Sequence, residues 1–183
     1  MTKDIDLGDY WVFGYGSLMW RPGFPFAEMA PAQLAGWRRD MCIQSIHYRG
    51  TPDVPGLVSG LTPGGTCNGR AYRIHHHEID GVIAYLDERE LVTDVYLAQH
   101  HDVALSDGRV VSARVYVADT EHDQFAGHWP VERKIDYLLQ GTGSEGRSLE
   151  YLANIVEQLD QLGIADEGLS ALLNLARAQT GSR

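Results

Sequence analysis

The chain has 183 residues, of which 44% are hydrophobic and 22% charged, so it is long enough to bury a core and has the composition of a globular protein. Its formal net charge of −10 argues against a nucleic-acid-binding surface or an anionic membrane as partner, because like charges repel. A small molecule is the expected partner.

The sequence predicts a single domain over residues 1–183, with a core at about 10–162 and a C-terminal helix at 166–178. Two cysteines and an N-terminus without an apolar signal segment argue against a disulfide framework and secretion, so the cytoplasm is the expected compartment. No apolar run reaches the roughly 18 residues of a membrane span. The sequence does not indicate an oligomeric state.

The first expected element is an apolar and aromatic run at 10–13 that leads into a glycine-rich loop. Gly14 and Gly16 permit positive φ and let main-chain N–H groups approach a ligand, so this loop can hold a carboxylate or phosphate. The lysine of a P-loop and the third glycine of a dinucleotide fingerprint are absent, which argues against both nucleotide motifs. The alternative interpretation is a tight corner between a strand and a loop.

Strands are expected next at 41–47, 57–61 and 67–74, because turn-forming residues separate three runs of strand composition. The turns lie at 48–56 and 63–65 and are rich in glycine and proline. Arg49, in the first turn, either pairs with an acidic ligand or braces the turn.

An amphipathic helix is expected at 79–90, where apolar residues recur at helical spacing. At about 100° per residue, Glu90 falls within about 20° of the line of Ile79, whereas Glu88 falls on the opposite face. We therefore expect Glu90 to face the core at a helix C-terminus, where burial and the helix dipole both raise a carboxylate pKa. Such a group is a candidate general acid/base. The alternative is an ion-paired structural carboxylate, although Arg89 lies on the wrong face to be its partner.

The last third of the chain predicts a hairpin and then helices. Strands at 93–105 and 109–118 flank a Ser-Asp-Gly turn. One helix begins at Pro130 and stops at Gly141, a second follows an apolar stripe, and Asp166 caps the last. This order predicts an α+β fold, an antiparallel-rich, barrel-like sheet with helices packed on it.

Other reactive groups form weaker patterns. Consecutive side chains of the three histidines at 75–77 diverge and no partner stands at ligand spacing, so no metal site is expected there. Ser17 lacks the Gly-X-Ser-X-Gly context of an exposed nucleophile, and its hydroxyl is expected to donate a hydrogen bond to a ligand. Neither Cys42 nor Cys67 stands in a Cys–His motif.

Four segments resemble the ChaC-like γ-glutamylcyclotransferases, the glutathione-specific branch of the cyclotransferase superfamily. The first reads Trp-Val-Phe-Gly-Tyr-Gly-Ser-Leu-Met-Trp at 11–20, and the others lie at 49–56, 85–90 and 146–151. The resemblance implies a small β-barrel flanked by helices, a carbon–nitrogen lyase, and no metal or organic cofactor. It also implies that Glu90, the last residue of a Leu-Asp-X-Arg-Glu pattern, is the catalytic residue.

The resemblance further implies cleavage of glutathione to 5-oxoproline and cysteinylglycine, by attack of the γ-glutamyl α-amine on its own γ-carbonyl. The family's Tyr-Gly-Ser-Leu loop binds the amino and carboxylate end of the γ-glutamyl group. The expected substrate contacts are Val12, Phe13, Gly14, Tyr15, Gly16, Ser17, Leu18, Arg49 and Tyr151.

Two alternatives to a glutathione-specific enzyme stay open. Residues 45–48 read Ser-Ile-His-Tyr where the family carries Ser-Thr-Asp-His, so a different substrate, another γ-glutamyl amino acid or a γ-glutamylamine, is the first. A catalytically silent γ-glutamyl-binding protein is the second, although a receptor has no need of an acid/base at Glu90.

Overall fold

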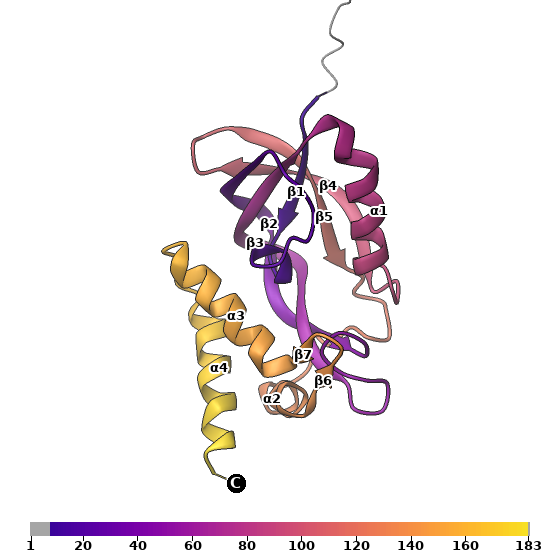
Figure 1. Cartoon of the computed structure of the whole chain (residues 1–183). Helices are drawn as coiled ribbons and strands as arrows, with labels where there is room; N and C mark the ends of the chain where they lie inside the picture. The colour runs from indigo at the N-terminus through magenta and orange to yellow at the C-terminus, as the bar shows by residue number, and fades with distance from the viewer. Residues whose placement is uncertain (1–7, 183) are drawn as a thin grey trace, which may run out of the picture.

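The protein, described by a computed structural model over residues 8–182, contains in that range a closed barrel of five strands with helices packed around it (Figure 1). Neighbouring strands are antiparallel except β1 and β5, which pair in parallel and close the barrel. The predicted α+β fold, a small antiparallel-rich β-barrel flanked by helices, is confirmed. In chain order the barrel strands are β1 (Tyr10–Gly14), β2 (Glu28–Ser45), β3 (Gly56–Ile74), β4 (Tyr96–Leu105) and β5 (Val110–Ala118).

Strands β2 and β3 form one long hairpin, and this differs from the sequence prediction. They span 18 and 19 residues, and the turn expected at 63–65 lies inside β3. The register of the pair shifts there, between Ala35 and Trp37 on β2, and Gly36 and Gly64 have φ of 84° and 101°. The glycines therefore form an irregularity that bends the hairpin around the barrel and do not reverse the chain.

Helix α1 (Ile79–Glu90) has the predicted bounds and packs across the outside of the barrel. Val82 and Leu86 on its inner face are buried in a cluster with side chains of β1 and β3. Asp87 fixes the helix to β5, because the Arg114 guanidinium and the Tyr116 hydroxyl donate to its Oδ1 at 2.6 and 2.7 Å. This packing determines where the last turn of α1 ends.

Three helices near the C-terminus form a second layer beside the barrel: α2 (Val131–Gln140), α3 (Ser148–Gln161) and α4 (Glu167–Thr180). Asp166 caps α4 as predicted, since its carboxylate accepts a hydrogen bond from the Leu169 N–H at 3.0 Å. A short hairpin of β6 (Thr142–Gly143) and β7 (Gly146–Arg147) joins α2 to α3.

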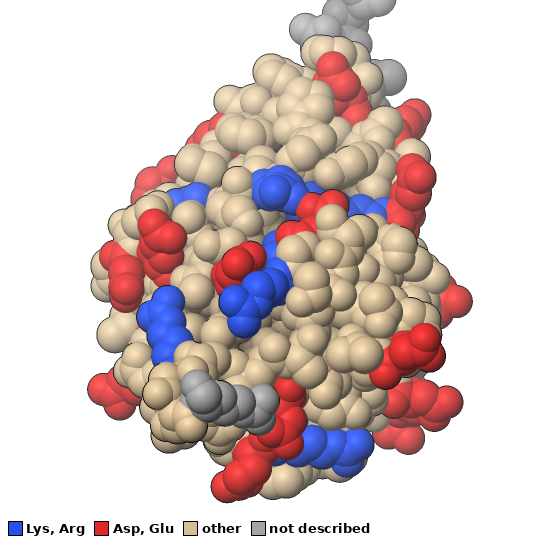
Figure 2. All heavy atoms as spheres, turned by 60° about the horizontal axis from the view of Figure 1, so that its bottom comes forward, with Lys and Arg blue, Asp and Glu red and all other residues tan. Residues whose placement is uncertain are grey.

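The single-domain prediction over 1–183 stays a prediction, and residues 1–7 and 183 of it lie outside the described range. Among the described residues, no helix is both long and apolar enough to cross a membrane. Acidic side chains are spread over the face shown in Figure 2, in keeping with the formal net charge of −10, and its basic side chains lie in separate groups beside them.

The side chain of Ser148 joins α3 to β3. Its fully buried hydroxyl accepts a hydrogen bond from the Leu57 N–H at 2.9 Å and donates one to the Leu57 carbonyl. Ser148→Ala should therefore lower the free energy of unfolding by about 1–3 kcal/mol, the cost of leaving buried backbone groups unpaired. Urea denaturation measures this loss. Ser144→Ala, at an exposed serine of the β6–β7 turn, is the matched control and should change stability by less than about 0.5 kcal/mol.

Candidate functional site

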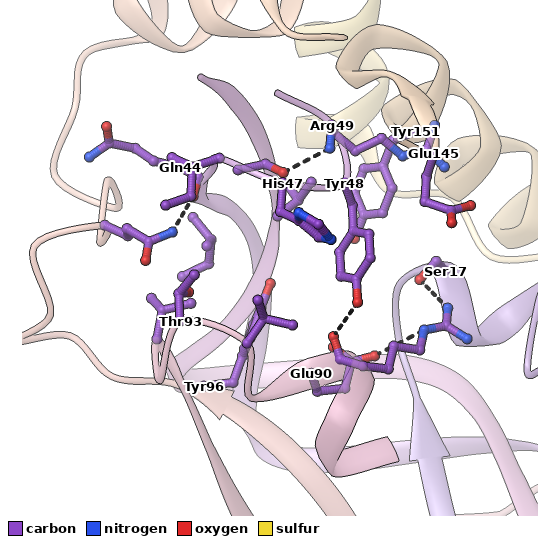
Figure 3. A pocket seen from close by; sticks show the side chains of 18 of the residues that line it. Ser17, Gln44, His47, Tyr48, Arg49, Glu90, Thr93, Tyr96, Glu145 and Tyr151 are labelled. Carbon is purple, nitrogen blue, oxygen red and sulfur yellow. Dashed lines mark hydrogen bonds and ion pairs between the residues drawn. The ribbon is translucent and has the colours of Figure 1, made fainter. Parts of the chain in front are cut away.

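A cavity of about 390 Å³ opens at the end of the barrel where β1 and α1 both end (Figure 3). Its walls come from residues 43–49, the C-terminal turn of α1, the loop after β1 and Tyr151 of α3. A smaller cavity of about 30 Å³ adjoins it and shares Ser17, Glu90, Tyr96 and Tyr151 with its lining. Segments far apart in the sequence thus meet at one opening.

Glu90 lines both cavities, as the helical-face argument predicts. Its side chain is 19% exposed, and burial raises its pKa while the neighbouring Arg89 guanidinium lowers it. Figure 3 shows Glu90 and Tyr96 on one side of the cavity, with Arg49 and Tyr151 on the other. A desolvated carboxylate that faces an open cavity is suited to act as a general acid or base.

The sequence interpretation of Arg89 was wrong. Its Nε lies 3.4 Å from Glu90 Oε1, so the two adjacent residues form an ion pair. The helical-face argument placed the Cβ atoms on different faces, but the long Arg89 side chain at the last turn reaches back across the helix end. The same guanidinium donates from Nη2 to Ser17 Oγ at 2.7 Å.

The loop after β1 needs its glycines for close packing. Gly16 has φ of −122° and ψ of −129°, and neither it nor Gly14 has the positive φ that the sequence permits. A Cβ on Gly16 would lie 2.7 Å from Tyr151 Oη and 3.0 Å from Ser59 Oγ, and one on Gly14 would lie 2.7 Å from Leu18 Cβ. The backbone of this loop therefore lies directly against the side chains of α3 and β3.

The predicted substrate contacts in the first strand and loop divide into two groups. Ser17 lines both cavities, and the smaller cavity is also lined by Phe13, Tyr15, Gly16 and Leu18. Val12 and Gly14 line neither cavity, and their contact with substrate stays a prediction. The side chain of Val12 is fully buried outside the barrel against α1, because successive side chains of a strand point to opposite faces.

Arg49 and Tyr151 both lie at the cavity, and Arg49 braces its turn, whereas its pairing with an acidic ligand stays a prediction. Its N–H braces the turn by donating to Ser45 Oγ at 2.9 Å, and its guanidinium lies 5.4 Å from the centre of the Tyr151 ring. Arg49 is 7% exposed and forms no salt bridge within residues 8–182. Burial lowers its pKa, so an acidic ligand group would relieve the cost of this buried charge.

Sequence reasoning missed the tyrosines that enclose Glu90. Tyr48 Oη donates to the carbonyl of Arg89 at 3.0 Å, and Tyr96 Oη donates to the carbonyl of Ser59 at 2.6 Å. Burial raises the pKa of both hydroxyls. Tyr48 lies in a turn and Tyr96 at the start of a strand, and neither position carries a local signal for a site.

No cluster of three or more His, Cys, Asp or Glu side chains suited to a metal ion occurs in the described range. The arrangement offers a carboxylate of raised pKa, a glycine loop, a buried guanidinium and several hydroxyls around one cavity. These groups suit acid–base chemistry on a small molecule that carries a carboxylate.

Comparisons with known proteins give a consistent result. A family model described as "ChaC-like protein" matches residues 10–179. A relative from Escherichia coli, named "Glutathione-specific gamma-glutamylcyclotransferase", is 34% identical over 92% of this chain and 73% of its own length. An Arabidopsis thaliana relative, "Gamma-glutamylcyclotransferase 2-3", is 35% identical over 91% of this chain and 88% of its own.

Among solved structures, a glutathione-specific γ-glutamyl cyclotransferase from yeast superposes with a TM-score of 0.86. It is 24% identical, and the alignment covers 93% of this chain and 96% of that one, so this likeness shows a common fold.

Glu90→Gln should stabilise the fold at neutral pH, because it removes a charge that burial disfavours. The folded-state pKa is raised, so the cost is absent below the ordinary value of 4.5 and grows as the pH rises through the folded pKa. Thermal unfolding should show a higher Tm for the variant at about pH 7, by about 2–4 °C for each kcal/mol gained in the free energy of unfolding. Below about pH 4 the variant and the wild type should have the same Tm.

The exposed Glu88→Gln is the matched control and should leave Tm unchanged at both pH values. A Glu90→Gln variant no more stable than the wild type at neutral pH would contradict the assignment of a desolvated carboxylate.

Proposed function

The chain belongs to the ChaC-like family, and we propose that it is a γ-glutamylcyclotransferase that cleaves glutathione to 5-oxoproline and cysteinylglycine. The family predicted from the sequence is thereby confirmed. The observation that carries the proposed reaction is Glu90, a carboxylate of raised pKa that faces the cavity next to the glycine loop. The names of the relatives support glutathione as the substrate.

In the proposed reaction the attacking group belongs to the substrate. The α-amine nitrogen of the γ-glutamyl group attacks its own γ-carbonyl carbon, a carbon–nitrogen bond closes the five-membered ring, and the bond to the cysteinyl nitrogen breaks. The α-nitrogen loses two protons as it changes from an ammonium to the ring amide, and the departing nitrogen gains two as it becomes the ammonium of cysteinylglycine. Glu90 carries these protons from the one nitrogen to the other. Atoms balance without water, and the residues of the site need no cofactor for these proton transfers.

The loop around Ser17 is proposed to hold the amino-acid end of the γ-glutamyl group. The first amides of a helix lack intrahelical acceptors. In the short helix η1 (Ser17–Met19) the first hydrogen bond runs from the Met19 N–H to the Gly16 carbonyl, so the N–H groups of Ser17 and Leu18 have no acceptor within this helix. Ser17 Oγ accepts from Arg89, so its own proton is free to donate to a ligand. Holding amine and carbonyl at attack distance supplies several kcal/mol of the rate enhancement.

The rest of the substrate is proposed to occupy the larger cavity. Its 390 Å³ falls in the range of small-molecule sites, and its walls offer a substrate carboxylate the guanidinium of Arg49, which forms no salt bridge within residues 8–182. Free thiols at Cys42 and Cys67 agree with the proposed cytoplasmic location.

A panel of substrates tests the proposed function against its two alternatives. Purified protein with glutathione should release 5-oxoproline and cysteinylglycine in equal amounts, measured by chromatography. Faster turnover of γ-glutamylamines or of other γ-glutamyl amino acids would replace glutathione as the substrate. Thermal stabilisation by these compounds without any 5-oxoproline would show a binding protein instead.

Glu90→Gln should keep the fold and lose roughly 10²-fold or more in kcat, the range for loss of a general acid/base. Glu88→Gln, two residues earlier at the rim of the cavity, keeps the helix and serves as its control with near-native kcat. Steady-state kinetics on glutathione measure both. Activity of the Glu90→Gln variant close to the wild type would remove Glu90 from the mechanism.

The rate should also depend on pH in a defined direction. Glu90 acts first as a base, so kcat/KM should fall as the pH is lowered through its raised pKa. A profile of kcat/KM against pH measures the acid limb. A limb at the ordinary value of 4.5 would show that the acting group is not a desolvated carboxylate.

A further inference from the structure

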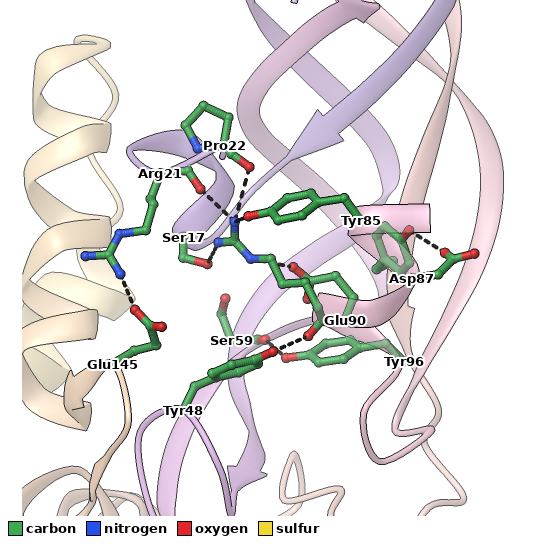
Figure 4. Close-up of polar contacts among 12 residues, drawn as sticks. Ser17, Arg21, Pro22, Tyr48, Ser59, Tyr85, Asp87, Glu90, Tyr96 and Glu145 are labelled. Carbon is green, nitrogen blue, oxygen red and sulfur yellow. Dashed lines mark hydrogen bonds and ion pairs between the residues drawn. The ribbon is translucent and has the colours of Figure 1, made fainter. Parts of the chain in front are cut away.

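The guanidinium of Arg89 is surrounded by acceptors from two separate parts of the site, and Figure 4 labels the residues that supply them. Besides the ion pair with Glu90 and the bond to Ser17 Oγ, its Nη1 donates to the carbonyls of Arg21 and Pro22 at 2.8 and 3.2 Å. The side chain is 15% exposed, so these bonds are largely shielded from water. Arg89 therefore contacts both the proposed catalytic carboxylate and the loop that is proposed to bind the substrate.

Other hydrogen bonds join this loop to the barrel and not to helix α1. Tyr72 Oη donates to the carbonyl of Leu18 at 2.6 Å, and Arg39 Nε donates to that of Tyr15 at 2.7 Å, so both tie the loop to the barrel. Between the described residues of the loop at 15–23 and helix α1, every hydrogen bond comes from Arg89. The backbone of Arg89 is itself fixed from a third segment by the Tyr48 hydroxyl.

We infer that Arg89 is a positioning residue that sets the separation between the substrate-holding loop and the Glu90 carboxylate. The inference rests on the proposed function. The amine and carbonyl of the bound substrate must lie next to the Glu90 carboxylate, so a displacement of about 1 Å between loop and helix can lower the rate by about 10²-fold. The barrel fixes the loop and the α1 packing fixes the helix, and Arg89 joins the two at the point of reaction.

An arginine suits this position because its planar group offers five N–H donors in a fixed fork. Nη1 also donates to Tyr85 Oη at 3.1 Å, so Nε, Nη1 and Nη2 are all engaged. Lysine has one nitrogen and a different reach, so it keeps the charge but cannot make the same set of contacts.

The charge of Arg89 gives a second, separable effect. Arg89 lowers the pKa of Glu90 against the effect of burial. Four hydroxyls face Glu90 from the loop, the segment after β2, β4 and α3, and stay neutral near pH 7: Tyr15, Tyr48, Tyr96 and Tyr151. The larger cavity is also lined by the ionisable side chains of Arg21, His47, Arg49, Glu88 and Glu145, but the cation that lowers the pKa of Glu90 is Arg89. Removing the cation should therefore raise the pKa of Glu90 further.

Arg89→Lys and Arg89→Gln separate position from charge. Both variants should lose about 10- to 100-fold in kcat on glutathione, because both lose the fork of contacts. The acid limb of kcat/KM should move to higher pH in the Gln variant and stay in place in the Lys variant. Arg109→Gln removes a cation that pairs with Glu28 and lines neither cavity, and it should match the wild type in both measurements.

Near-native kcat in both Arg89 variants would overturn the inference. Equal acid limbs in the Gln variant and the wild type would overturn the separate effect of the Arg89 charge. Amide hydrogen exchange provides a readout that does not need turnover. Amides at 15–22 should exchange faster in the Lys variant while those of the β4–β5 hairpin stay unchanged, and equal exchange would overturn the inference. If the wild type forms no 5-oxoproline, the proposed function is wrong. Amide hydrogen exchange then still tests whether Arg89 positions the loop. If the Gln variant does not fold, the Lys variant decides it by kcat and exchange.

Discussion

The structure of the site depends on the removal of the Glu90 carboxylate from water. Helix α1 packs Val82 and Leu86 against the barrel, and this packing carries its last turn to the barrel opening. A carboxylate placed there loses hydration, and within residues 8–182 the ion pair with Arg89 is its one polar side-chain contact. Burial disfavours its charge and Arg89 favours it, and burial has the larger effect, so the pKa of Glu90 is raised. That balance costs the fold some stability and gives the site its acid–base capacity.

On the opposite side of the cavity, the packing of the wall depends on the missing side chain of Gly16. Because Gly16 has no Cβ, the Tyr151 hydroxyl can lie against the loop and share a 2.6 Å hydrogen bond with Ser59 Oγ. This contact joins α3, β3 and the first loop at one point, with the Arg49 guanidinium on the outer face of the Tyr151 ring. The helices of the C-terminal third therefore stabilise the barrel and also complete the site.

Much of this arrangement could be predicted from local patterns. Periodicity placed Glu90 on the inner face of α1, and composition indicated a strand that ends in a glycine-rich loop. The contacts of Arg89 could not be predicted, because Ser17 lies 72 positions earlier and the length of a flexible side chain overrides the face of its Cβ. The predicted strand lengths were wrong at Gly64 for a related reason. Glycines permit both a chain reversal and a bulge, and only the pairing of β2 with β3 decides between them.

The same contacts explain why the site suits a reaction in which the substrate supplies its own nucleophile. Ser17 Oγ lies 2.7 Å from a guanidinium, which cannot accept its proton, so the hydroxyl is not activated for attack. Cys42 is fully buried, with its pKa raised to about 12, and its thiol stays protonated. Glu90 stands at the cavity with Arg89 beside it and remains available to proton transfer. A site with a proton carrier but no activated side-chain nucleophile favours ring closure within a bound γ-glutamyl group, because holding that group in a folded conformation supplies what a covalent intermediate would otherwise provide.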